Sequence, residues 1–443
     1  MKSFKRNLFF QIVDSFILLI HISYGMSMLQ VWFLDPFNIP FRLDLIVLTL
    51  LAYYYRFGDR FKLLNINNKP AVVLFLLTYV ADIFQNIFTD SAGGAIVRIF
   101  TMFDMYLFME YVYAVYDESR KKKLNGRNSV FISYEIFTVY NVVAVLLCAV
   151  LLYVGVLNPY SNQLAPNSLT MSHYVNKGTI HFFPGFLSLT EGGMRGLISF
   201  NVPVLTGLSH EPHVLFLLIG PAFFLLLQRF HQKVGVSVAL YISFLVMLVI
   251  ATSTTAIFSF VIVLVVEQIY GIVFPMGKSK YSNILILVLV AAIGFWMFSS
   301  DFGTALLDTT EMIESKTSVE SDEGSLGHAL TMLSYVVTPQ SFFGQGNMPS
   351  GGWGFNLSKQ NIGLLSSILD ILFYIIMLYK AFVNVFSPNR NCHYLGLATL
   401  YFLLHILKMS IQEFGFPQLA FFVVMTVIMD KEKMKPVYEK KKF

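Results

Sequence analysis

Apolar segments long enough to cross a lipid bilayer recur along almost the whole chain. A membrane-spanning helix needs about 20 mostly apolar residues, and twelve segments approach this length. They cover residues 8–33, 41–56, 69–89, 94–117, 130–157, 213–228, 234–251, 254–275, 282–300, 363–385, 394–410 and 415–430. Only 13% of the residues are charged, whereas a soluble domain has about 25%. The pattern therefore predicts an all-α polytopic membrane protein.

The distribution of lysine and arginine predicts the orientation of these segments. With Met1 in the cytoplasm, 24 of the 31 basic residues fall in segments on the cytoplasmic side, as the positive-inside rule requires. The least certain boundary is the turn at Ala251–Thr255. If residues 234–275 formed one helix, six C-terminal lysines would face outward, so we expect twelve spans with both termini inside.

This topology divides the chain into five parts. Five helices occupy residues 1–157, and a long outer loop follows at 158–212. Four helices occupy 213–300, a second long outer loop covers 301–362, and three helices with a basic cytoplasmic tail complete 363–443. Loops of such length usually carry function. The apolar residues between 186 and 202 predict short helices on the membrane surface within the first loop.

The segment 207–213 reads Gly-Leu-Ser-His-Glu-Pro-His and leads from the first loop into an apolar helix. Ionisable side chains at membrane depth usually mark a functional site. Pro212 suits the first turn of a helix, where its missing N–H costs no hydrogen bond, so Glu211 is expected beside the helix N-terminus. Two interpretations stay open. His210, Glu211 and His213 either cap the helix or line a wet pocket in which one of them acts as a base.

Cationic side chains are rare on the predicted outer side. Arg195 lies in the first loop, and Arg98 and Lys408 lie in the outer halves of helices. Arg195 is either an interfacial residue that contacts lipid phosphates or a bidentate ligand of a substrate phosphate. Arg98 either forms a buried pair with Asp82 or joins Arg195 and Lys408 in an electropositive cavity. Such a cavity would suit a diphosphate in the outer leaflet.

The second outer loop carries one further candidate. Apolar residues at helical spacing over 326–337 predict a helix bearing His328, which faces either a cavity beside the first loop or the membrane interface. No cysteine or histidine spacing suits a metal, so neither a metal nor another cofactor is expected. The basic residues are spread over many short loops, and no nucleic-acid partner is expected either.

Three short motifs carry a family resemblance. They are Arg195-Gly196, the Ser-x-Glu-Pro of residues 209–212, and the Pro-x-x-Phe-Phe-Gly-x-Gly of residues 339–346. Together with a dozen spans and two large outer loops, they resemble the Wzy-type O-antigen or capsule repeat-unit polymerases of the O-antigen polymerase and ligase superfamily. The topology covers the whole chain and the motifs about two dozen residues. Members of this family often carry an arginine before the Phe-Gly-x-Gly turn, whereas this chain has His328.

The resemblance implies a reaction and its participants. A glycan on undecaprenyl diphosphate would pass to a sugar hydroxyl of another lipid-linked repeat unit, at the periplasmic or exterior face of the cytoplasmic (inner) membrane. A polysaccharide chain-length regulator is a further implied partner. A base and a cationic diphosphate ligand are needed. The candidate bases are Glu211 and His210, with His213 and His328 assisting, and the candidate diphosphate ligands are Arg195, Arg98 and Lys408.

Two alternatives stay open. An O-antigen ligase shares the general plan and differs in its acceptor, lipid A-core. A lipid-linked oligosaccharide flippase or transporter could also have twelve spans. Two long outer loops are not needed for transport, and the two halves of this chain show no matching pattern of the kind that transporter repeats leave.

Overall fold

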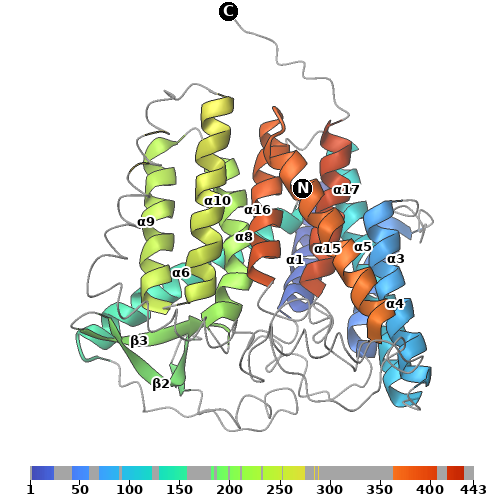
Figure 1. Cartoon of the computed structure of the whole chain (residues 1–443), viewed down its shortest axis with the longest axis horizontal. Helices are drawn as coiled ribbons and strands as arrows, with labels where there is room; N and C mark the ends of the chain where they lie inside the picture. The colour runs from blue at the N-terminus through green and yellow to red at the C-terminus, as the bar shows by residue number, and fades with distance from the viewer. Residues whose placement is uncertain are drawn as a thin grey trace, which may run out of the picture.

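The computed structural model describes residues 2–23, 42–58, 69–88, 92–121, 129–156, 181–183, 187–197, 200–209, 212–230, 233–251, 253–274, 284, 288, 363–406 and 417–433. These residues form a helical bundle with a small sheet at one end (Figure 1). In chain order the elements are α1 (Lys2–Ile22), α3 (Leu43–Phe57), α4 (Pro70–Phe88), α5 (Ala92–Lys121), α6 (Ser129–Tyr153), β1 (His181–Phe183), β2 (Leu187–Leu197), β3 (Phe200–Gly207), α8 (Pro212–Phe230), α9 (Val234–Ala251), α10 (Thr254–Val273), α15 (Gly363–Val385), α16 (Arg390–Ile406) and α17 (Pro417–Lys433).

The helices correspond to the apolar segments of the sequence. A helix overlaps eleven of the twelve predicted segments, and the segment 282–300 lies outside the described residues apart from positions 284 and 288. Among the described residues, six helices are long and apolar enough to cross a membrane: α4, α5, α6, α8, α10 and α15. Large apolar side chains are exposed on them, such as Ile136 and Leu147 of α6 and Phe258 of α10. The chain is therefore a helical membrane protein, and the full count of twelve spans stays a prediction.

The break between α9 and α10 confirms the predicted turn at Ala251–Thr255. Helix α9 ends at Ala251 and α10 begins at Thr254. Ser253, directly before α10, accepts a hydrogen bond from the backbone N–H of Ala256 at 3.4 Å. Serine is a favoured N-cap because its oxygen satisfies one of the unpaired N–H groups of the first turn.

One prediction for the segment 158–212 is wrong. Instead of surface helices, residues 187–207 contribute two antiparallel strands, β2 and β3, and β1 pairs with the other side of β2. Apolar residues alternate with others along 200–204, which is the period of a strand. Gly192 and Gly193 disfavour a helix, and they fall in a register shift between Leu189 and Met194. The short alternating stretch and the two glycines therefore favour strands over surface helices.

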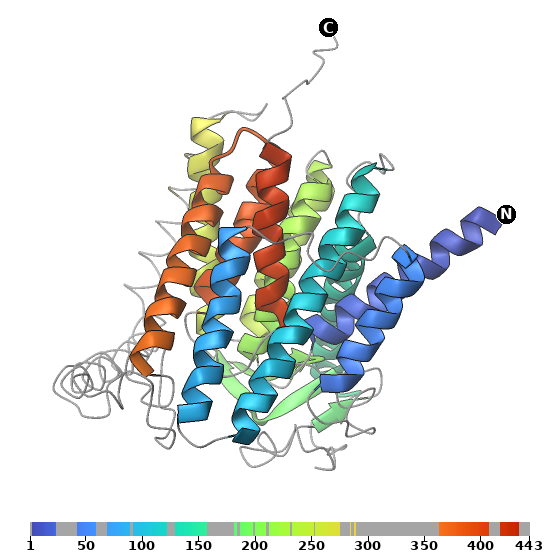
Figure 2. The same cartoon turned by 90° about the vertical axis from the view of Figure 1, so that its right-hand side faces the viewer.

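Helices α8 and α16 form the centre of the bundle and run antiparallel. The His405 ring of α16 contacts the His213 carbonyl near the start of α8, and Gln228 near the end of α8 donates to Asn391 at the start of α16 at 2.7 Å. Both helices are almost wholly buried. The end of the bundle at which the three strands lie, here called the sheet end, also holds the start of α8 and the end of α16 (Figures 1 and 2).

Candidate functional site

The end of β3 leads into a tight, buried turn at the sheet end, and this turn together with the start of α8 is here called the corner. Gly207 has a φ of 56°, in the left-handed region that glycine adopts without strain. The Ser209 N–H donates to the Thr206 carbonyl at 3.0 Å, which closes the turn. Leu205, Thr206, Leu208 and Ser209 are all buried. Helix α8 then begins at Pro212, which confirms the predicted helix start.

Asn141 of α6 holds the strand side of this corner. Its side-chain oxygen accepts the Leu208 N–H at 3.2 Å, and its amide donates to the Phe137 carbonyl at 2.9 Å. Asn141 is 1% exposed. A Cβ at Gly207 would lie 2.8 Å from the same oxygen, so only glycine allows the strand to approach α6 this closely.

His405 of α16 holds the helix side of the corner. Its Nε2 lies 2.7 Å from the His213 carbonyl oxygen, and since a carbonyl only accepts, Nε2 carries the proton. The ring is buried and stacks on Tyr401, one turn earlier on α16, at 5.7 Å between centroids. The corner is thus held from two helices that are far apart in sequence.

A glycine and a proline in the middle of α8 affect its packing and its backbone hydrogen bonds. A Cβ at Gly220 would lie 2.1 Å from a Tyr401 ring carbon, so the glycine leaves the space that Tyr401 occupies. Pro221 has no N–H and removes one bond from the helix. The Tyr134 hydroxyl of α6 donates to the nearby Leu218 carbonyl. These contacts fix α8 against α6 and α16 where its own ladder is interrupted.

Of the four predicted base candidates, the structure describes only His213, which lies at this corner. His213 is the second residue of α8 and is partly buried. His210 and Glu211 lie outside the described residues, between Ser209 and Pro212. His328 also lies outside the described residues.

Two of the three predicted cationic ligands, Arg195 and Arg98, lie on elements that the structure describes. Arg195 lies on β2 opposite Val202 of β3. Val202 stands five residues before Gly207. Arg98 lies on α5, and its Nε is 3.7 Å from a carboxylate oxygen of Asp82 on α4. The predicted pair of Arg98 and Asp82 is therefore present, with Asp82 buried and Arg98 partly exposed. Lys408 lies outside the described residues.

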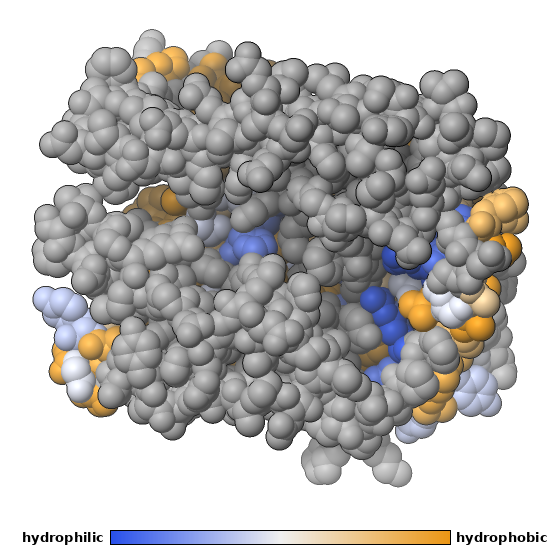
Figure 3. All heavy atoms as spheres, turned by 60° about the horizontal axis from the view of Figure 1, so that its bottom comes forward, coloured by the Kyte–Doolittle hydropathy of each residue, from blue (hydrophilic) through white to orange (hydrophobic). Residues whose placement is uncertain are grey.

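A second buried polar cluster lies beside that pair and was not predicted. His21 of α1 donates from Nδ1 to the Ile17 carbonyl at 2.7 Å, and its Nε2 lies 3.2 Å from Asp104 of α5. Arg42, just before α3, lies 3.6 Å from the other Asp104 oxygen. The sequence could have indicated this cluster, since the ionisable residues His21 and Asp104 stand inside predicted spans. Figure 3 views the sheet end and shows hydrophilic residues among hydrophobic ones on the side where Figure 1 places α4 and α5.

Comparison with known proteins adds no relative. No family model, no curated protein and no solved structure matches this chain. Among the described residues, no group of three His, Cys, Asp or Glu side chains is arranged to hold a metal ion. The fold and the site together define the class, a helical membrane protein with a buried corner between a strand and the start of an apolar central helix.

Proposed function

We propose that this protein is a polymerase that joins undecaprenyl-diphosphate-linked oligosaccharide repeat units at the outer face of the cytoplasmic membrane. The hydroxyl oxygen of the acceptor sugar attacks the anomeric carbon of the donor glycan. The bond between that carbon and the diphosphate oxygen breaks, and undecaprenyl diphosphate leaves. Glu211 or His210 takes the hydroxyl proton, and Arg195 binds the diphosphate.

The observation that supports this proposal best is the construction of the corner. A Glu-Pro pair stands at the beginning of α8, where unpaired backbone N–H groups and the helix dipole favour a negative charge. The residues on either side, Leu208 and His213, are held by Asn141 and His405. Backbone positions held by buried side chains of two other helices are placed more precisely than positions on a free loop.

The proposal assigns diphosphate binding first to Arg195. Arg98 already faces Asp82, and a paired guanidinium offers less net charge to an anion. Arg195 belongs to the sheet that leads into the corner. Lys408 follows two residues after the end of α16, the helix that carries His405, and is the second candidate.

The competing functions predict different products. An O-antigen ligase would transfer preassembled glycan to lipid A-core and leave chain length unchanged. A flippase or transporter would move the lipid-linked unit without forming a glycosidic bond. Polymerisation of purified lipid-linked units by the purified protein would exclude both.

The first test replaces the proposed base. Glu211→Gln keeps the size of the side chain and its capping oxygen but removes the basic carboxylate. We expect a rate loss of roughly 100- to 10,000-fold, whereas a lost cap costs only about 1 kcal/mol of stability. In cells without the native gene, the variant should yield a single-repeat band instead of a ladder. A full ladder at normal protein level would reassign the base to His210 or His328.

The second test replaces the proposed diphosphate ligand. Arg195→Ala should abolish polymer while the protein still inserts in the membrane. Arg195→Lys should restore little activity, because an ammonium cannot reproduce the bidentate fork of a guanidinium. Gel analysis of the polymer against immunoblotting of the protein measures both. Normal polymer from Arg195→Ala would make Arg195 an interfacial residue.

A further inference from the structure

We propose that Gln418 and Thr138 form a buried subsite for one sugar ring of the lipid-linked oligosaccharide. Gln418 is the second residue of α17, and Thr138 lies in α6. The assignment of the sugar to a lipid-linked unit rests on the proposed function. The subsite itself rests on the packing and burial of the two side chains, and binding to it can be measured without any polymerisation.

Both side chains are buried without a hydrogen-bond partner in the described part of the chain. Each residue is 1% exposed, and neither the two polar atoms of the Gln418 amide nor the Thr138 hydroxyl oxygen is bonded there. Other buried threonines satisfy their hydroxyl locally, since Thr399 and Thr426 donate to carbonyls of the preceding turn at 2.8 Å. Because buried polar atoms are bonded in the great majority of cases, these three atoms indicate a ligand that bonds to them.

Four aromatic rings in mutual contact lie next to the two side chains and are here called the aromatic floor. Tyr134 of α6 meets Phe421 of α17 edge to face, with ring centroids 5.6 Å apart. Phe421 contacts Phe422 at 5.4 Å, and Phe422 stacks on Phe402 of α16 at 4.1 Å, again between centroids. All four rings are almost wholly buried. The aromatic floor therefore joins α6, α17 and α16 inside the bundle.

Helix periodicity places Thr138 on the sheet-end side of the aromatic floor. Residues four apart lie on the same face of a helix, one turn from each other. Thr138 follows Tyr134 by four residues, and α6 runs toward the sheet end, where it contacts β3 (Figure 1). Phe131, seven residues before Thr138, also contacts Phe421 of α17. The face of α6 that carries Thr138 is therefore the one that faces α17.

The same periodicity places Gln418 in that layer. Gln418 precedes Phe422 by four residues. Helices α16 and α17 are antiparallel, because Phe402 stacks on Phe422 while the earlier Cys392 thiol donates to the carbonyl of the later Met429. The end of α16 lies at the sheet end, so the start of α17 lies toward it as well. Gln418 therefore stands one turn from the aromatic floor, on the same side as Thr138.

The composition of this layer fits a sugar better than an anion. A carboxamide offers two N–H donors and an acceptor oxygen, and a threonine hydroxyl both donates and accepts. An ionised diphosphate only accepts and would leave the Gln418 Oε1 atom without a donor, whereas neighbouring sugar hydroxyls satisfy both ends of the amide. The aromatic floor suits the apolar C–H face of a sugar ring. His405, three residues after Phe402, contacts the start of α8, so the sugar would lie beside the corner.

The experiment replaces each side chain by an apolar one of similar shape, as Gln418→Met and Thr138→Val. Thr426→Val, also in α17, is the matched control, because the Thr426 hydroxyl is already bonded to the Val423 carbonyl. The full-length protein is reconstituted in phosphatidylcholine nanodiscs, whose lipid headgroup carries no hydroxyl. The probe is the repeat-unit oligosaccharide released by mild acid from lipid-linked units of cells that lack this protein. Titration calorimetry gives its dissociation constant.

We expect the wild-type protein and Thr426→Val to bind this oligosaccharide equally well. Gln418→Met and Thr138→Val should each weaken binding about ten-fold, as the loss of one or two buried hydrogen bonds does. Without oligosaccharide, both variants should unfold at the same or a higher temperature than the wild type, because an unsatisfied buried polar group is removed. Lower affinity without lower stability distinguishes a binding role from a structural one.

The inference is overturned if the wild-type protein does not bind the oligosaccharide, or if either variant that folds binds it with wild-type affinity. If one variant does not fold, the affinity of the other decides. The proposed function fails separately. Weakened binding in the variants, together with no polymer from intact lipid-linked units and the wild-type protein, would refute the polymerase and leave the sugar subsite in place.

Discussion

Gly220 and Tyr401 show how a single residue decides the packing of the central helices. Glycine inside a helix costs roughly 1 kcal/mol relative to alanine, yet α8 carries one at its middle. The reason is on the neighbouring helix, because the Tyr401 ring occupies the position that a Cβ would need. The fully buried Tyr401 ring in turn supports His405.

We predict that Gly220→Ala destabilises the protein by about 1–3 kcal/mol, as overpacking of a filled core does, despite the better helix propensity of alanine. Thermal unfolding in detergent measures the change. The matched control is Gly235→Ala in α9, where no described atom lies within 4 Å of the added Cβ. That variant should be neutral or slightly more stable, and equal effects from the two would contradict the packing argument.

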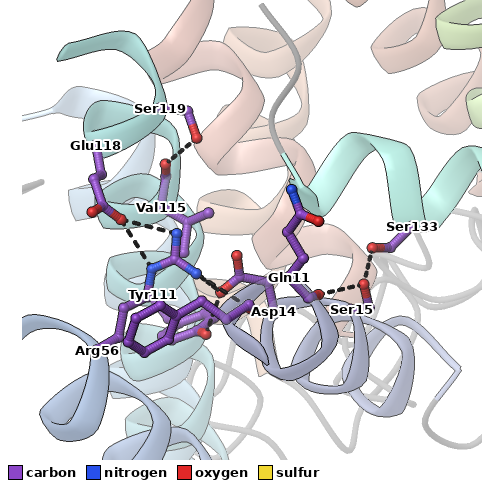
Figure 4. A network of polar contacts seen from close by, with 10 residues as sticks. Gln11, Asp14, Ser15, Arg56, Tyr111, Val115, Glu118, Ser119 and Ser133 are labelled. Atoms are coloured by element: carbon purple, nitrogen blue, oxygen red, sulfur yellow. Dashed lines mark hydrogen bonds and ion pairs between the residues drawn. The ribbon is translucent and has the colours of Figure 1, made fainter. Parts of the chain in front are cut away.

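Buried ion pairs join helices at the end of the bundle opposite the sheet end. Arg56 of α3 lies between Asp14 of α1 and Glu118 of α5, and Tyr111 of α5 donates to Asp14 at 2.7 Å (Figure 4). Asp14 is fully buried, whereas Glu118 is 26% exposed. Three separate helices therefore share one charged network, whose central carboxylate has no access to water.

The two carboxylates of this network should differ in their effect on stability. Asp14→Ala leaves the buried Arg56 guanidinium without its inner partner, and we expect a loss of about 3–5 kcal/mol. Glu118→Ala removes a partly solvated partner and should cost about 1 kcal/mol or less. Denaturant unfolding of both variants in the same detergent gives the comparison. A larger loss from Glu118→Ala would show that the network is organised differently.

At the scale of the whole molecule, polar contacts between helices are found at both ends of the bundle. The corner, His405, and the Arg98–Asp82 pair lie toward the sheet end. The opposite end has further cross-helix pairs, Lys380 with Asp430, Lys431 with Asp117, and Arg229 with Glu135. This division agrees with alternating helices, and the sheet end corresponds to the outer side of the predicted topology.

A topology experiment tests the orientation directly. A reporter fused after Ser161 or after Ser318 should register as external, and one fused after Asn125 as cytoplasmic, because 24 of the 31 basic residues then lie inside, as the positive-inside rule requires. Paired alkaline phosphatase and fluorescent protein fusions give the measurement. A cytoplasmic signal at Ser318 would remove the second loop from the proposed site and with it the assisting role of His328.

Local patterns were enough to predict the helices. Apolar runs of bilayer length predicted where they lie, the polar break at Ala251–Thr255 predicted two helices instead of one, and Pro212 marked the start of α8. Each of these features depends on neighbours within a few turns, because helix formation and proline geometry are local. The sheet was not predicted, because apolar content alone does not distinguish surface helices from strands and the alternation along 200–204 is short.

Only the tertiary structure decided which side chains meet. It paired Arg98 with Asp82 and placed His405 on the His213 carbonyl and Asn141 on the Leu208 N–H. These partners are separated by 16 to 192 residues, and their contacts follow from how the helices pack. The amino-acid sequence by itself therefore determined the helices and indicated the Ser-His-Glu-Pro-His segment as a candidate site. Packing across α6, α8 and α16 decided which side chains hold the corner.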